Sequence, residues 1–200
     1  MKPFASLIAL VIAVVVAFAG CASTPPVRFH SLLSTGDAAA RDSGLPPLPV
    51  DLGPVGVPAA VDQSQWVVRL GDDSLRILEQ EQWVSPLRDE LRAALFERLA
   101  QRFAAVDTRS APATNTVRVK VDVQRFESIA GKEVWLDSLW SAQADTGKGA
   151  PLVCRSSVRE PAVGDLGALA AAHRRAVARL ADQIGSQLLA MYNGAGTRCP

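Results

Sequence analysis

Apolar and polar residues alternate most clearly in the middle of the chain. The apolar residues are Val117, Val119, Val121 and Val123. They alternate with the polar residues Arg118, Lys120, Asp122 and Gln124. This period of two predicts a strand over 117–126 with one buried and one solvated face. Similar patterns over 133–144 and 152–158, with turns around 129–131 and 146–149, predict a three-stranded antiparallel meander.

Shorter strand patterns occupy the region before the meander. They cover residues 28–33, 50–58, 66–70 and 75–79. Pro54 falls inside the second pattern, and because proline cannot donate to a ladder we expect that segment to be an edge or bulged strand. Residues 71–74 have the composition of a hairpin turn between the third and fourth patterns.

Two helices are predicted from apolar residues that recur at helical spacing. In the first, leucine recurs every four residues at positions 87, 91, 95 and 99, after Ser85 as the expected N-cap and Pro86 at the first helical position. This helix is expected to end near Phe103. The charged residues that lie away from the centre of its apolar stripe are Arg88, Arg92, Glu97 and Arg98. A longer helix is predicted over 166–192, with Asp165 as its N-cap.

This order of elements favours one fold class. Strands, a helix, a meander and a final helix predict an α+β domain: a two-layer sandwich in which two main helices pack on one face of a mostly antiparallel sheet. We expect a single domain over residues 29–192, followed by a C-terminal tail over 193–200.

The first twenty residues have the pattern of a secretory leader. Lys2 supplies positive charge, an apolar run follows from Leu7 to Phe18, and small residues come directly before Cys21. This is typical of a bacterial lipoprotein: cleavage of residues 1–20 and acylation of Cys21 with chains such as palmitate. A transmembrane anchor is the alternative, because the uncharged stretch is close to the roughly 18 residues that a span needs. Residues 21–28 would form a lipidated tether.

Charge and cysteine content narrow the partners and cofactors. The chain carries 21 basic and 20 acidic side chains, a balance that argues against a nucleic-acid partner. Beyond Cys21, Cys154 and Cys199 are expected to pair in an oxidising periplasm. That disulfide would close a loop of about 45 residues, worth on the order of 4 kcal/mol. Two independent thiols are the alternative, and the cysteines and histidines make a poor metal-ligand set, so we expect no metal and no cofactor.

Catalytic motifs are absent from the sequence, which favours binding over catalysis. A histidine-dependent site would have to use His30, near the tether, or His173, on or near the apolar face of the last helix. We expect His173 to be a core or boundary residue. The tryptophans at 66, 83, 135 and 140 either fill the core or contribute one or two exposed contact residues, since tryptophan and arginine dominate interface energetics. Trp66, Arg69 and Trp83 are the candidate partner-binding residues.

Several segments resemble one known family in their order along the chain. They are Arg28-Phe29-His30-Ser31-Leu32, the run from Leu52-Gly53-Pro54-Val55-Gly56-Val57-Pro58 to Asp62, Gln65-Trp66-Val67-Val68-Arg69 and Gln82-Trp83-Val84-Ser85-Pro86-Leu87. Together with the leader cysteine, this order resembles the PqiC (YmbA) family of ABC-type transport auxiliary lipoproteins. The resemblance extends over residues 28–192.

The resemblance implies a non-catalytic auxiliary subunit of an MCE-type intermembrane lipid transport system that supports envelope integrity. The protein would be anchored to the periplasmic face of the outer membrane, as Ala22 after the acylated cysteine also favours by similarity to sorting in enteric bacteria. It would bind an MCE-domain protein and could self-associate as a ring. The polar face of 117–126 and the segment 50–70 are candidate docking surfaces. Two alternatives are an assembly lipoprotein for an outer-membrane translocon or barrel, and a periplasmic hydrolase.

Overall fold

A computed structural model describes residues 25–33, 48–71, 73–106, 116–145, 150–195 and 198–199. The predicted leader, Cys21 and the turn at 146–149 lie outside these residues. Within them the chain forms eight strands and two helices. In chain order these are β1 (Arg28–His30), β2 (Pro49–Gly56), β3 (Gln65–Arg69), β4 (Leu75–Trp83), α2 (Leu87–Ala100), β5 (Ala104–Val106), β6 (Val117–Ile129), β7 (Glu133–Ala144), β8 (Leu152–Pro161) and α3 (Leu166–Tyr192).

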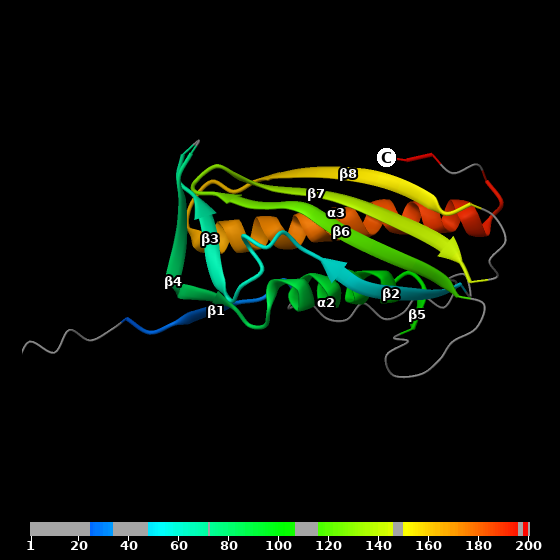
Figure 1. Cartoon of the computed structure of the whole chain (residues 1–200), viewed down its shortest axis with the longest axis horizontal. Coiled ribbons are helices and arrows are strands. Elements are labelled where there is room, and N and C mark those ends of the chain that lie inside the picture. Colours follow the sequence, from blue (N-terminus) through cyan, green and yellow to red (C-terminus); the bar gives the residue numbers. More distant parts are fainter. Residues whose placement is uncertain are drawn as a thin grey trace, which may run out of the picture.

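All eight strands belong to one mixed sheet built around β6. Strand β6 pairs antiparallel with β7, and β7 pairs antiparallel with β8, which confirms the predicted meander. On the other side of β6, β2 runs parallel to its first half and β3 meets it at Ile129. The β3–β4 hairpin carries β1 on its outer side, and β5 lies parallel to β2 (Figure 1).

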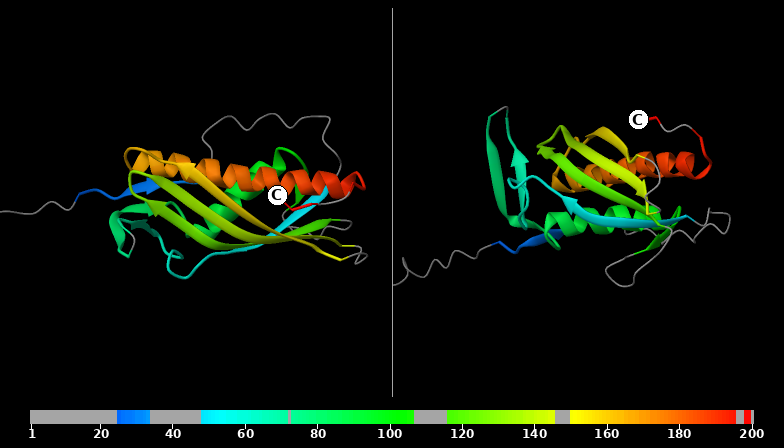
Figure 2. Two further views of the ribbon diagram at one scale, coloured as in Figure 1. Left: turned by 90° about the horizontal axis from the view of Figure 1, so that it is seen from above. Right: turned by 45° about the vertical axis from the view of Figure 1, so that its right-hand side comes forward.

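Both helices pack on the same face of the sheet, so the predicted two-layer α+β fold is confirmed (Figure 2). The leucine stripe of α2 and the apolar face of α3 meet the inward valines of β6 in one continuous core. The buried members of the helices include Leu87, Leu91, Leu95, Leu99, Leu169, Leu180 and Ile184. Burial of these side chains, at roughly 1.5–3 kcal/mol for each large aliphatic residue, supplies most of the drive to fold.

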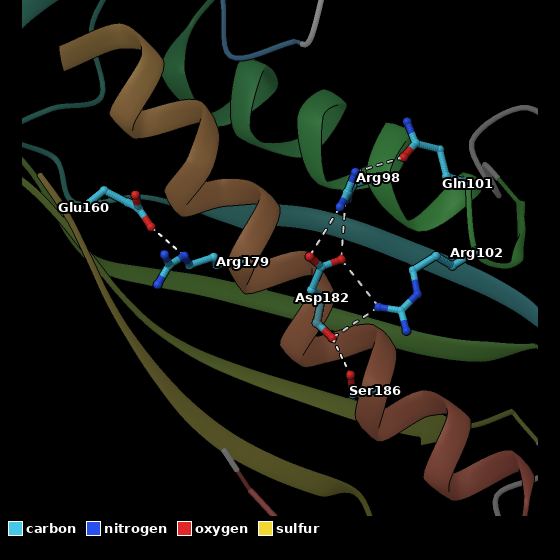
Figure 3. Close-up of polar contacts among 7 residues, drawn as sticks. All are labelled: Arg98, Gln101, Arg102, Glu160, Arg179, Asp182 and Ser186. Atoms are coloured by element: carbon cyan, nitrogen blue, oxygen red, sulfur yellow. Dashed lines mark hydrogen bonds and ion pairs between the residues drawn. The ribbon is translucent and has the colours of Figure 1, made fainter. Parts of the chain in front are cut away.

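Ion pairs fix the two helices to each other and α3 to the sheet (Figure 3). Asp182 of α3 accepts hydrogen bonds from Arg98 of α2 and from Arg102, two residues after the end of α2, at N–O distances of 3.3–3.4 Å. On the next face of α3, Arg179 Nε lies 2.6 Å from Glu160 Oε1 of β8. Arg175 Nε lies 2.9 Å from the other oxygen of the same carboxylate. Because Glu160 is buried, it depends on these two arginines: without them its carboxylate would be a desolvated, unpaired charge.

The two helices begin differently, and only one as predicted. Asp165 accepts a hydrogen bond from the Ala168 amide at 3.0 Å, which confirms it as the N-cap of α3. Helix α2 has Pro86 at the N-cap position without a side-chain cap, so the prediction for Ser85 is wrong. Ser85 Oγ instead donates to Glu90 at 2.9 Å, because that buried carboxylate requires donors.

Replacement of the α3 cap gives a test of this local geometry. We expect Asp165→Ala to lower the free energy of unfolding by about 1 kcal/mol, because the Ala168 amide loses its acceptor. Asp165→Asn is the matched control, since its carbonyl oxygen can still accept and should retain most of the stability. Thermal unfolding followed by circular dichroism measures both. Equal destabilisation by the two variants would contradict the cap.

Strand β2 has an irregularity of the kind that Pro54 predicted: its register against β6 shifts between Leu52 and Val55, and β5 pairs only with its first residues, 49–51. Helix α2 ends at Ala100 rather than near Phe103, and β5 follows where no strand was predicted. Arg92 lies away from the centre of the apolar stripe but is only 9% exposed, since its guanidinium donates to the Leu52 carbonyl at 3.0 Å.

The tail that follows α3 is joined to the sheet. Cys154 of β8 and Cys199 form a disulfide across 45 residues, as the cysteine pattern predicted. The closed loop contains most of β8 and all of α3. The bond therefore holds the last helix and the strand beneath it in one covalent ring.

Candidate partner-docking surface

The tryptophans predicted as partner contacts lie in the core. Trp66 is 1% exposed and Trp83 is 2% exposed, and their ring centroids are 4.7 Å apart. His30, Phe126 and His173 complete an aromatic cluster around them. The partner-contact prediction is therefore wrong for both residues, because a side chain closed off by the sheet and α3 cannot meet a partner.

A chain of hydrogen bonds runs through this cluster. Trp66 Nε1 donates to Ser128 Oγ at 2.7 Å, and the same oxygen lies 2.7 Å from His173 Nε2. His173 is fully buried and stacks on Phe126 with centroids 4.1 Å apart, which confirms it as a core residue. Burial disfavours the imidazolium and lowers the pKa of His173 to about 3.

The Ser128–His173 pair has the composition of a nucleophile and its base but not the working arrangement. A general base works best with a pKa near the operating pH, and His173 is far below it. Its Nδ1 has no hydrogen-bond partner in the described chain, so the orienting carboxylate of a triad is missing there. Ser128 Oγ is also buried and already accepts from Trp66. The pair therefore fits a structural role better than a hydrolytic one.

The second histidine is part of the attachment of β1. His30 Nε2 lies 2.6 Å from Glu81 Oε2, and Arg28 Nε donates to the other carboxylate oxygen at 2.7 Å. Burial alone would raise the pKa of Glu81, but the hydrogen bonds from His30 and Arg28 outweigh it and hold that pKa below its ordinary value. These contacts fix the strand that follows the predicted tether to β4.

Arg69 remains at the surface, at the edge of a charged network on the solvent face of the sheet. Its guanidinium donates two hydrogen bonds to Glu127 of β6, at 3.2 and 3.1 Å. Next to this pair, Asp137 of β7 lies 3.4 Å from Arg125 and 3.5 Å from Arg159. Such bidentate and shared pairs hold long side chains in defined positions, which an isolated surface ion pair does not.

The half-exposed Trp135 completes the network. The guanidinium carbons of Arg159 and Arg125 lie 3.9 and 5.0 Å from its ring centroid. Arginine over an indole face is a favourable cation–π arrangement. Of the four tryptophans, Trp135 rather than Trp66 or Trp83 is thus the one presented on the charged face.

A cavity of about 170 Å³ opens beside Arg69, where β2 ends and β3 has not yet reached β6. Its apolar lining comes from the segment between these strands, from the hairpin and from β6. It consists of Pro58, Ala60, Val61, Val67, Leu75 and Phe126. Arg69 and Glu127 stand at the polar side of the same cavity. An apolar recess with charged groups beside it fits a contact for a partner side chain.

The polar face of β6 extends this surface away from the cavity. The side chains of Arg118, Lys120, Asp122 and Gln124 are exposed, as predicted. The first three of these residues, together with Leu139 and Val153, line a shallow hollow of about 670 Å³ against β2. We use "outer sheet face" for the surface formed by the Arg69 network, its cavity and this hollow.

The sequence analysis named Arg69 as a candidate partner-binding residue, but it did not name the residues that surround Arg69. Glu127, Asp137, Trp135 and Arg159 occupy alternate positions on three neighbouring strands, so their shared face could have been expected. Which of them meet depends on the register, and the register shifts between Val123 and Arg125 of β6. Among the described residues, no group of three or more histidine, cysteine, aspartate or glutamate side chains is placed to hold a metal. None of the described helices has the length and hydropathy of a membrane span.

Comparison with known proteins agrees with this architecture. One solved structure, of an uncharacterised protein, matches with a TM-score of 0.66 at 16% identity, covering 82% of this chain and 99% of the other. A second, of a Xanthomonas campestris protein, matches with a TM-score of 0.62 at 18% identity, covering 85% and 96%. At these identities the likeness shows the fold alone. No curated protein matches the sequence.

The described residues form a two-layer α+β fold, with one mixed sheet and two helices packed on one of its faces. The profile of the family described as "ABC-type transport auxiliary lipoprotein component" matches residues 30–185. The chain belongs to this family, as the order of its sequence segments predicted. It is thus a lipoprotein component associated with a transport system.

Proposed function

We propose that this protein is the non-catalytic auxiliary subunit of an MCE-type intermembrane lipid transport system, anchored through acylated Cys21 to the periplasmic face of the outer membrane. It would bind the MCE-domain protein through the outer sheet face. Membership of the transport auxiliary lipoprotein family supports the class. The single observation that carries the docking surface is the bidentate Arg69–Glu127 pair beside an apolar cavity.

The partner is tested by isolating the tagged full-length protein from its own membranes in a mild detergent. Mass spectrometry then identifies the proteins that copurify, and the mass of the N-terminal peptide reports acylation of Cys21. Recovery of an MCE-domain protein supports the proposal. Recovery of lipopolysaccharide-transport or barrel-assembly proteins without it would contradict the proposal and favour an assembly lipoprotein. Whether the chain forms a ring follows from the mass of the purified complex.

Charge reversal at Arg69 tests the docking surface. We expect Arg69→Glu to weaken binding of the MCE-domain protein on the order of tenfold, which corresponds to about 1.4 kcal/mol. The same variant also places two carboxylates together, so the double variant Arg69→Glu/Glu127→Arg is needed to restore the internal pair. If the partner contacts the positive charge of Arg69 directly, the double variant still binds weakly. If Arg69 has only a structural role, the double variant binds with normal affinity.

The matched control for this experiment is Arg76→Glu. Arg76 lies on the same hairpin, opposite Val68 in the β3–β4 register, so it points to the other face from Arg69. It makes the same change in net charge and should leave affinity unchanged. Affinity is measured by surface plasmon resonance at two salt concentrations, because loss of a charged contact also reduces the salt dependence.

A further inference from the structure

Exposed apolar side chains are concentrated at one end of the molecule. Of the eleven large hydrophobic residues exposed in the described chain, seven belong to β1, the β3–β4 hairpin with its flanks, and the β8–α3 connection: Val27, Phe29, Leu70, Leu75, Ile77, Val84 and Val163. Scattered exposed apolar residues are ordinary, but a cluster marks a contact surface. We call this set of seven the apolar end.

Hydrogen bonds show that these segments are neighbours. The Ala130 amide, in the β6–β7 turn, donates to the Arg69 carbonyl at the tip of the hairpin at 3.1 Å. In the same turn the Lys132 carbonyl accepts from Ala162, next to Val163, at 2.8 Å. In Figures 1 and 2 the hairpin, β1 and the start of α3 lie together at the same end of the long axis, opposite the end of α3.

The chain also leaves toward the predicted lipid anchor at this end. Residues 21–28 span at most about 25 Å even when fully extended. Helix α3, with 27 residues, is about 40 Å long, so an orientation in which only the far end of the molecule meets a bilayer that holds Cys21 is out of reach. An acylated Cys21 would therefore keep β1, at the apolar end, within about 25 Å of the membrane.

Phe29 is held in position at the point nearest the anchor. On either side of it, Arg28 and His30 both bind Glu81, so Phe29 occupies the opposite face of β1 and is 63% exposed. The His30 carbonyl also accepts from the amide of Val84, which is 62% exposed. Because β1 is already held in place, little conformational entropy is lost when the ring of Phe29 binds a surface. Aromatic side chains also favour the membrane interface.

We propose that the apolar end is a membrane-docking surface that rests on the lipid bilayer next to the acyl anchor. Phe29 and Val84 would contact the interfacial region of the bilayer, with Ile77 and Leu75 of the hairpin beside them. A lipid anchor together with an apolar protein contact gives the two signals that make membrane attachment and orientation stable. The inference depends on acylation of Cys21, and it is independent of the identity of the transport partner.

Spin labels in the full-length acylated protein test this orientation. The protein is reconstituted in nanodiscs of phosphatidylethanolamine and phosphatidylglycerol, and single cysteines are introduced by Phe29→Cys or Ile77→Cys. Val153→Cys and Tyr192→Cys are the matched controls, because both residues are exposed apolar side chains away from the apolar end. With Cys21 acylated and the disulfide intact, the introduced thiol is the one that reacts.

Accessibility to oxygen, which partitions into lipid, is compared with accessibility to a water-soluble nickel complex. We expect oxygen to reach the labels at positions 29 and 77. The accessibility of these two labels to the nickel complex should be at least threefold lower than that of the two control labels. Equal nickel accessibility at all four sites would overturn the proposal. Protection of 29 and 77 from both reagents would also overturn it, since that pattern indicates contact with protein, such as a second copy. Should Phe29→Cys fail to fold, quenching of Phe29→Trp by brominated lipid, with Val153→Trp as control, reads the same contact.

Discussion

Loss of the Cys154–Cys199 disulfide is expected to lower the free energy of unfolding by about 4 kcal/mol. The bond closes a loop of 45 residues, and in the chain-entropy model the cross-link restricts the unfolded chain by approximately this amount. The native state would also lose the attachment of its C-terminal tail to β8. Domains commonly have only about 5–15 kcal/mol of stability, so the reduced protein would be marginal.

The comparison of reduced and oxidised protein isolates this effect. Thermal unfolding of the full-length protein in mild detergent is measured with and without dithiothreitol, beside the variant Cys199→Ser. The variant should unfold like the reduced wild type and should not respond to reductant. Cys154 then remains as a buried thiol, which behaves as a small apolar residue and adds no strain of its own. A wild-type curve that does not move on reduction would contradict the predicted stabilisation.

The elements that the sequence predicted best are those with a regular period over many residues. The alternation in β6 and the apolar face of α3 each repeat several times, so one exception does not change the pattern. Strand β5 has three residues and was not predicted; β4 was predicted over 75–79 but extends to Trp83, where it has no clean alternation. The register between β3 and β4 shifts between Gln65 and Trp66, and the last three residues of β4, 81–83, pair with β1.

The candidate site was harder to predict, because exposure depends on the whole sheet. Trp66 and Trp83 stand beside polar residues in the sequence, and only the packing of α3 over β3 and β4 shows that they are buried. Ser85 shows the same limit at a smaller scale. Its side chain is of a type that often caps helices, but its hydroxyl donates to the buried carboxylate of Glu90 in the first turn of α2. The same carboxylate also accepts hydrogen bonds from Ser31 and Leu32.

These findings give the molecule two surfaces, which meet at Leu75: it lines the cavity of the outer sheet face and belongs to the apolar end. The outer sheet face combines the fixed charges of Arg69, Glu127 and Asp137 with an apolar cavity, a composition that suits a protein partner. The apolar end lies next to the predicted anchor and has few fixed ion pairs beyond those that hold β1. If both proposals hold, the apolar end rests on the outer membrane, and the outer sheet face next to it remains accessible from the periplasm. The Arg69 and Phe29 experiments test the two surfaces independently.

Acidification below pH 6.5 is expected to destabilise the fold through His173. In the unfolded chain a histidine has a pKa near 6.5, whereas burial lowers the pKa of His173 to about 3 in the folded protein. Between these values the unfolded state binds more protons, so stability is fully present above pH 6.5 and falls as the pH falls. The slope is about 1.4 kcal/mol per pH unit, which gives a loss of roughly 2.7 kcal/mol by pH 4.5.

The contribution of His173 can be separated from that of the carboxylates. Glu81 has a lowered pKa in the folded state, so its stabilisation is lost only as the pH falls below 4.5, outside the upper part of this window. His173→Gln retains a group that can bond Ser128 Oγ but cannot titrate, and its unfolding free energy should be nearly flat from pH 6.5 to 4.5. Glu81→Gln is less stable overall but should keep the wild-type slope there. Urea unfolding at several pH values measures all three proteins. A wild-type slope that survives in His173→Gln would assign the acid sensitivity to another group, and it would contradict the neutral, buried imidazole at the centre of the core.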